Sequence, residues 1–123
     1  VHRVRKLLGG GMRQSGMLAA AALYALDHHR QRLQEDHARA RRLAQALSNM
    51  RHVTLDPTTV ETNIVAFELC DGVESAMDVQ TRLDDQGVRV FAIGPRRLRA
   101  VTHLDIDDRQ IDVAIDTLAS VLD

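Results

Sequence analysis

The feature that most constrains the fold is the long stretch of residues 12–49. It contains no proline and a single glycine, and it is rich in the helix formers alanine, leucine, arginine and glutamine. A continuous helix of this length would be about 57 Å long, whereas a compact chain of 123 residues has a radius of gyration of about 14 Å. We therefore predict a long connecting helix that is broken near His28 and His29 or that reaches toward parts outside this sequence.

The second half of this stretch shows a helical repeat. One face follows alternating steps of three and four residues, and it consists of Leu33, His37, Ala40, Leu43, Ala44, Leu47 and Met50. Charged residues occupy the other faces. We expect this part of the helix to pack along one side only.

The rest of the chain alternates between strand and helix patterns. Four runs rich in β-forming residues are bounded by turn signals such as Asp71-Gly72 and Gly94-Pro95. These runs are residues 52–55, 62–69, 88–93 and 98–104. No internal repeat or low-complexity segment interrupts them, so the pattern indicates one small domain with a sheet.

Two amphipathic helices accompany the strands. The first is marked by Val73, Ala76, Met77, Gln80 and Leu83. Gly87 is placed to end this helix, and the last helix follows Asp107, whose spacing from Gln110 is that of a capping box. The order predicts an α+β fold, in which a glycine-rich loop and a long amino-terminal connecting helix (residues 1–50) lead into a small two-layer β-β-α-β-β-α domain (residues 51–123).

Composition and charge exclude several classes of protein. Sixteen basic and 17 acidic residues give a net charge of −1, which argues against a nucleic-acid partner. No apolar run approaches the roughly 20 residues that span a bilayer, so we predict no membrane partner. The single cysteine, Cys70, indicates a reducing, cytoplasmic location. The histidines lack the spacing of zinc ligands, so we predict no metal site.

Three arginines crowd the beginning of the last predicted strand. Arg96, Arg97 and Arg99 follow the Gly94-Pro95 turn. Strand alternation divides the segment into two sides, with Arg97, Arg99 and Val101 on one and Leu98, Ala100 and Thr102 on the other. An arginine in this place is suited to bidentate binding of a carboxylate. The alternative is a solvated charge that prevents pairing with a further strand.

A glycine-rich segment precedes the long helix. Lys6 and two leucines run into Gly9, Gly10 and Gly11, and Arg13 follows. A glycine-rich loop that leads into a helix offers free backbone N–H groups to an anion, although the Walker A pattern is absent. A flexible hinge is the alternative interpretation.

Several segments together carry a familiar pattern. They are residues 6–16 (KLLGGGMRQSG), 18–21 (LAAA), 24–26 (YAL), 32–37 (RLQEDH), 62–65 (TNIV) and 99–105 (RAVTHLD). In this order, and over essentially the whole chain, they resemble the low-specificity L-threonine aldolase family, whose members are fold-type I pyridoxal-phosphate enzymes. The resemblance implies retro-aldol cleavage of L-threonine and L-allo-threonine to glycine and acetaldehyde.

The implied chemistry depends on pyridoxal phosphate, which accepts the electrons left at the α-carbon when the Cα–Cβ bond breaks. A lysine must hold this cofactor as a Schiff base. The chain has 15 arginines but one lysine, Lys6, and in the family the Schiff-base lysine lies further upstream. We therefore expect the Schiff-base lysine before Val1, no catalytic residue in this segment, and no activity of the segment by itself.

The resemblance assigns roles to three residues. Arg99 matches the family arginine that binds the substrate α-carboxylate, while Arg13 and Lys6 match loop residues that approach the cofactor phosphate or the substrate region of a neighbouring subunit. Arg96 and Arg97 match no residue of known role. The implied partners are an amino-acid substrate, the large domain of the same enzyme, and further copies in a homodimer or homotetramer.

Two other functions are compatible with the sequence. A related lyase of the same superfamily would carry out β-elimination instead of aldol cleavage. A free-standing α+β binding or dimerisation module would need neither a large domain nor a cofactor. The residues that precede Val1 in the reading frame distinguish the last possibility from the other two.

Overall fold

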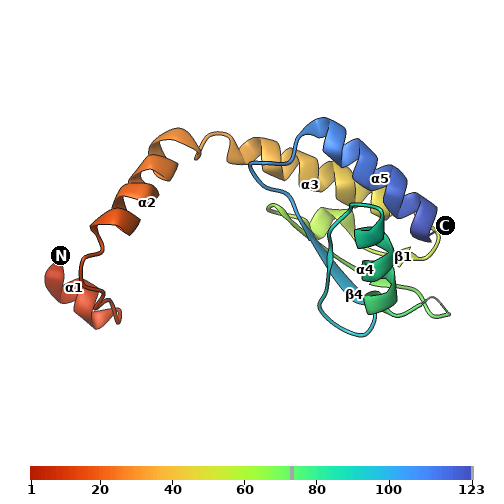
Figure 1. Ribbon diagram of the computed structural model, residues 1–123, viewed down its shortest axis with the longest axis horizontal. Helices are drawn as coiled ribbons and strands as arrows, with labels where there is room; N and C mark the ends of the chain where they lie inside the picture. The colour runs from red at the N-terminus through yellow and green to blue at the C-terminus, as the bar shows by residue number, and fades with distance from the viewer. Residues whose placement is uncertain (73, 123) are drawn as a thin grey trace. The chain divides into compact units, whose positions relative to one another are not determined.

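The computed structural model describes every residue except Val73 and Asp123. Figure 1 shows the order of the elements. They are α1 (His2–Leu7), α2 (Gly16–His28), α3 (Leu33–Leu47), β1 (Val53–Thr54), the 3₁₀ helix η1 (Pro57–Thr59), β2 (Ile64–Leu69), α4 (Ala76–Asp85), β3 (Phe91–Ala92), β4 (Arg97–Val101) and α5 (Asp108–Leu122). The predicted α+β class is confirmed, while Val73 in the predicted helix face and Asp123 at the predicted domain end lie outside the described residues.

The predicted long helix is divided in two. Helix α2 ends at His28 and α3 begins at Leu33, so the break falls beside His28 and His29, as predicted. The chain forms two compact units, Val1–Leu33 and Gln34–Asp123. The boundary we expected after residue 50 differs from this division because α3 contributes four residues to the core of the second unit.

The first unit consists of α1 and α2, and no residue of either helix is buried. Helix α1, which the sequence did not predict, ends in a Schellman motif. The N–H of Gly10 donates to the carbonyl of Arg5 at 2.8 Å, and the N–H of Gly9 donates to that of Lys6 at 3.1 Å. Gly9 has a φ of 80°, which glycine adopts without strain.

The second unit is a sheet covered by helices on one face. The strand order is β1-β2-β4-β3, and all neighbours are antiparallel. Burial alternates along β2 and β4, which is the pattern of a sheet with one packed and one open face. The core joins the packed face to one side of each of α3, α4 and α5, and includes Ala40, Leu43, Leu47, Val65, Phe67, Val79, Leu83, Leu98 and Leu118.

Helix ends in the second unit follow the predicted signals. The side chain of Asp107 accepts the N–H of Gln110 at 2.8 Å, and the N–H of Asp107 donates to the Gln110 side chain at 2.8 Å. This reciprocal pair is the predicted capping box of α5. Gly87, with a φ of 80°, ends α4 in a second Schellman motif.

All four strands are shorter than the sequence predicts, and the difference is largest for β3. Residues 88–93 were expected to form a strand, but only Phe91 and Ala92 pair with β4. Val88 follows the glycine cap and packs against the core together with Val90. These two residues contribute to the core without pairing with β4. Strand β4 likewise ends at Val101, before the chain turns.

Candidate functional site

Arg99 occupies the middle of β4 on the open face of the sheet. Its cross-strand partners are Ala66 of β2 and Phe91 of β3. The residue is exposed, and its side chain forms no hydrogen bond or ion pair with any residue that the structure describes. The guanidinium is therefore available to a ligand.

The two neighbouring arginines differ from Arg99. The Nε of Arg96 donates to the carbonyl of Leu69 at 3.1 Å, and its guanidinium lies 3.4 Å from the carboxylate of Asp71. Arg96 thus holds the turn between β2 and α4. Arg97 lies directly across from Glu68, and opposite charges in that relation attract each other.

Arg99 has no carboxylate across from it on either neighbouring strand, because alanine and phenylalanine occupy those positions. The carboxylate on this face, Glu68, stands opposite Arg97 and forms no ion pair with Arg99 among the described residues. The predicted alternation of the two sides is confirmed. It assigns Arg97 and Arg99 to the exposed side and buries Leu98, Ala100 and Thr102.

Arg99 lies on what we call the open face, which consists of Ile64, Ala66, Glu68, Phe91, Arg97, Arg99 and Val101. Several of its neighbours on this face are apolar. Ile64, Phe91 and Val101 remain 46%, 52% and 39% exposed. A second surface laid on this face would remove water from around the guanidinium and strengthen its interaction with an anion. The open face is therefore one wall of a site rather than a complete site.

A cavity lies elsewhere in the second unit. It has a volume of about 540 Å³ and is lined mainly by residues of α5, of β4 and of the chain before β3, including Val90, Ala100, Ile111 and Leu118. Arg99 does not line it. This cavity is therefore not a pocket for a carboxylate held by Arg99.

Lys6 and Arg13 both lie in the first unit. Lys6 is in the last turn of α1 and Arg13 is in the segment between α1 and α2. Both are exposed, and neither side chain forms a hydrogen bond or ion pair within the described part of the chain. Two free cations on a short segment suit an anionic group such as a phosphate.

Two of the three glycine N–H groups are not available to the anion cradle that we considered. The N–H groups of Gly9 and Gly10 are used to cap α1, so they do not point toward a ligand. A side chain at Gly10 would place its Cβ 2.8 Å from Cγ and 2.9 Å from the carbonyl oxygen of Arg5. The close approach of this backbone to Arg5 explains a glycine here without a phosphate.

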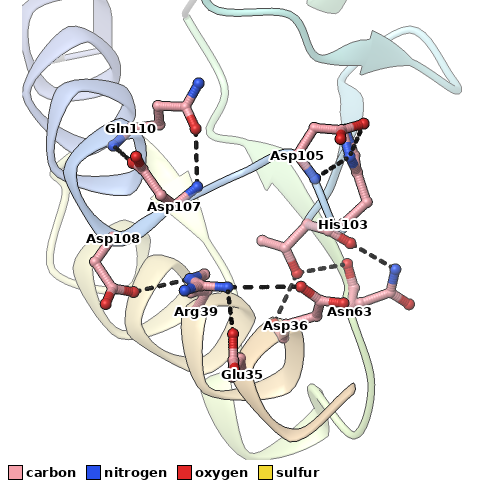
Figure 2. A network of polar contacts seen from close by, with 10 residues as sticks. Glu35, Asp36, Arg39, Asn63, His103, Asp105, Asp107, Asp108 and Gln110 are labelled. Carbon is pink, nitrogen blue, oxygen red and sulfur yellow. Dashed lines mark hydrogen bonds and ion pairs between the residues drawn. The ribbon is translucent and has the colours of Figure 1, made fainter. Parts of the chain in front are cut away.

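One polar cluster was missed by sequence reasoning. Figure 2 shows hydrogen bonds and ion pairs among residues of α3, of the start of α5 and of the segments before β2 and after β4. Asp36 and Thr102, both nearly completely buried at 3% and 2%, belong to it. The only signal in the sequence was the alternation that put Thr102 on the buried side of its strand.

Arg39 links the two helices in this cluster. Its Nε donates to Asp108 at 2.8 Å, and its guanidinium lies 3.4 Å from Glu35 and 3.8 Å from Asp36. The hydrogen bond with Asp108 is the main reason why the pKa of Arg39 is raised above its usual value. Arg39 therefore stays charged and ties the start of α3 to the start of α5.

The described residues lack both a metal-binding cluster and a membrane-spanning helix. They contain no group of three or more His, Cys, Asp or Glu side chains that could hold a metal ion. Among the helices of this part of the chain, none combines the length and apolar character required to cross a membrane.

Comparison with known proteins identifies the class. The family model described as beta-eliminating lyase matches residues 1–70. The chain belongs to this family.

Two relatives define the more specific similarity. "Low-specificity L-threonine aldolase 1" of Arabidopsis thaliana is 39% identical over 104 residues, covering 84% of this chain and 29% of the relative. "Low specificity L-threonine aldolase" of Escherichia coli (strain K12) is 40% identical over 109 residues, covering 89% and 31%. The chain thus spans less than a third of the length of these relatives.

Solved structures show a similar fold. The cystine C–S lyase C-DES, in complex with its reaction product cysteine persulfide, superposes with a TM-score of 0.68 at 23% sequence identity, over 85% of this chain and 28% of that one. A C-DES mutant with glycine covalently linked to its PLP cofactor gives the same values. The mixed fold of this chain therefore occurs as one part of larger enzymes.

Proposed function

We propose that this chain is the carboxy-terminal part of a pyridoxal-phosphate-dependent aldolase that cleaves L-threonine and L-allo-threonine to glycine and acetaldehyde. The observation that carries the proposal is Arg99, an exposed guanidinium without an internal partner and without a carboxylate across from it. The substrate class follows from the names of the Arabidopsis and E. coli relatives.

In this proposal Arg99 binds the α-carboxylate of the amino acid through two parallel N–H···O hydrogen bonds. Fixing the carboxylate orients the rest of the substrate, including the Cα–Cβ bond that breaks. The apolar side chains around Arg99 exclude water when the remainder of the enzyme covers the open face. The chain then contributes substrate binding and orientation rather than proton transfer.

Lys6 and Arg13 fit the phosphate of the cofactor because both cations are exposed and lack partners among the described residues. Pyridoxal phosphate supplies the electron sink for cleavage of the Cα–Cβ bond. We place the lysine that binds it covalently upstream of Val1, in the large domain, and we propose that the 123-residue chain is inactive by itself. The assembly would be a cytoplasmic homodimer or homotetramer.

Replacement of Arg99 tests the proposed function. In the complete enzyme, Arg99→Ala should raise the KM for threonine by about 10- to 100-fold, the range expected for lost hydrogen bonds to a charged group. Bound cofactor should stay at the parental level. Arg97→Ala is the matched control, because it removes an arginine from the same strand and face. An unchanged KM in the Arg99 variant would contradict the proposal.

A second candidate is a β-eliminating lyase, favoured by the description of the family model and by the C–S lyase with a similar fold. The complete enzyme should be supplied with threonine and, separately, with serine. Acetaldehyde and glycine support aldol cleavage, whereas pyruvate supports β-elimination. A third candidate, the free-standing module, is contradicted if the reading frame before Val1 encodes a lysine-containing domain.

A further inference from the structure

The end of β4 is held in an unusual way, three residues beyond Arg99. Strand β3 pairs with β4 at Leu98 and Arg99, and just after β3 the N–H of Ile93 donates to the carbonyl of Arg97 at 2.8 Å, so no described residue on this side pairs with β4 beyond Arg99. Strand β2 continues alongside as far as Val101. The carboxyl end of β4 therefore has a strand neighbour on one side only, and its position depends on whatever holds the residue that follows.

That residue is Thr102, and four hydrogen bonds hold it, the longest from its hydroxyl to the carbonyl of Asn63 at 3.5 Å. Its N–H donates to the carbonyl of Asn63 at 3.0 Å, and its own carbonyl accepts the side-chain amide of Asn63 at 2.7 Å. Its hydroxyl donates to the main-chain carbonyl of Asp36 at 2.7 Å. The bonds to Asn63 hold Thr102 to the residue that precedes β2, whereas the hydroxyl bond to Asp36 reaches a different layer, helix α3.

The partner of this hydroxyl is itself firmly held. Asp36 is 3% exposed, and its carboxylate lies 3.8 Å from Arg39, which in turn binds Asp108 at the start of α5. Figure 2 shows this chain of contacts between the two helices. The hydroxyl of Thr102 therefore connects β4 to a fixed point rather than to a mobile loop.

We propose that Thr102 is a positioning residue that sets the location of Arg99 through the hydroxyl bond to Asp36. The inference rests on the proposed function, because it concerns how Arg99 meets the substrate carboxylate. Bidentate binding requires both guanidinium N–H groups to face the carboxylate. A small displacement of β4 along the sheet normal is enough to impair this alignment, since binding geometry is sensitive to shifts of about 1 Å.

Thr102→Val isolates the hydroxyl, because valine keeps the branched shape of threonine and removes the donor. In the complete enzyme it should weaken binding of glycine by about threefold to tenfold, in line with one lost hydrogen bond. Binding of glycinamide, which has no carboxylate, should change by less than about twofold. Titration of the cofactor absorbance measures both. Equal losses for the two ligands would contradict the proposal, since a general loss of structure makes no such distinction.

Two variants control for loss of a hydroxyl as such. Thr102→Ser keeps the donor and should restore the affinity for glycine to within about twofold of the parent. Thr117→Val removes a similar bond, from Thr117 to the carbonyl of Val113 at 2.8 Å on α5, and should leave the ratio of the two ligands unchanged. If Thr102→Val does not accumulate, Thr102→Cys takes its place as a weak donor of similar volume.

A double variant separates this inference from the proposed function. When Arg99 is already alanine, Thr102→Val should have no further effect on glycine binding, because residues that act through one another are not additive. If Arg99→Ala alone leaves glycine binding unchanged, the proposed function fails. If Arg99→Ala weakens binding but Thr102→Val does not, only the positioning role is overturned.

Discussion

Helices α2 and α3 arise from one proline-free stretch but differ in how they are stabilised. Helix α3 buries Ala40, Leu43, Ala44 and Leu47 against the sheet and α5. Helix α2 is apolar on several sides yet buries nothing, and Leu18, Leu23 and Leu26 remain about 60% exposed. An apolar helix without a polar face is normally covered on more than one side. Two helices of similar propensity therefore differ in packing. Helix α3 is stabilised by the core of the second unit, whereas α2 would need an external surface to cover its apolar side chains.

The largest expected contrast comes from truncating one leucine in each helix. In the recombinant 123-residue chain, Leu47→Ala should reduce the free energy of unfolding by about 2–5 kcal/mol, because Leu47 is completely buried. Leu23→Ala should change it by less than about 0.5 kcal/mol. Urea unfolding followed by circular dichroism measures both. Equal effects would show that α2 is packed within this chain after all.

The two Schellman motifs offer a contrast of intermediate size. Gly9 and Gly87 share a φ of 80°, and an added Cβ would meet no atom within 4 Å at either position. Alanine in a left-handed conformation costs about 1 kcal/mol or more. Gly87→Ala should therefore lower the free energy of unfolding by about that amount.

Gly9→Ala introduces the same strain in the first unit, where α1 buries no residue. It should leave the urea midpoint of the whole chain unchanged, because local fraying does not disturb the core. A comparable loss of stability from both variants would indicate that the two units unfold as one.

The smallest expected effect is a pH dependence in the second unit. The hydroxyl and then the N–H of Thr58 donate to Asp56 at 2.7 Å and 2.9 Å, and they lower the pKa of this carboxyl. The lowered pKa of Asp56 stabilises the fold at pH values above the pKa of the unfolded state, which is about 4. This contribution is lost as the pH falls through the pKa of the folded state. Asp56→Asn should reduce stability slightly at pH 6 and not at pH 2. A constant difference in the urea midpoint at both values would contradict this assignment.

Local signals predicted much of the fold. The spacing of Asp107 and Gln110 predicted the start of α5, and Gly87 predicted the end of α4. Both predictions succeeded because helix caps depend on residues only a few positions apart. Strand alternation placed Arg99 on the exposed side. The sequence did not predict α1, since six residues carry too little periodicity, and it did not show that the glycines after α1 cap that helix.

The missed features depend on contacts between distant residues. Thr102 and Asp36 are 66 positions apart, and no local pattern relates them. The length of β3 was also misjudged, because Val88 and Val90 fit a strand as well as they fit a packed loop. For the candidate site, alternation gave the exposure of Arg99, whereas its role in carboxylate binding stays a prediction that the variants above test.

Every residue of the hydrophobic core lies at Ala40 or later, after the break between α2 and α3. The folding of the second unit therefore places no restriction on which side chains α2 carries. Among related sequences, the side chains of α2 should therefore vary independently of the core of the second unit, whereas those on the buried side of α3 should stay apolar.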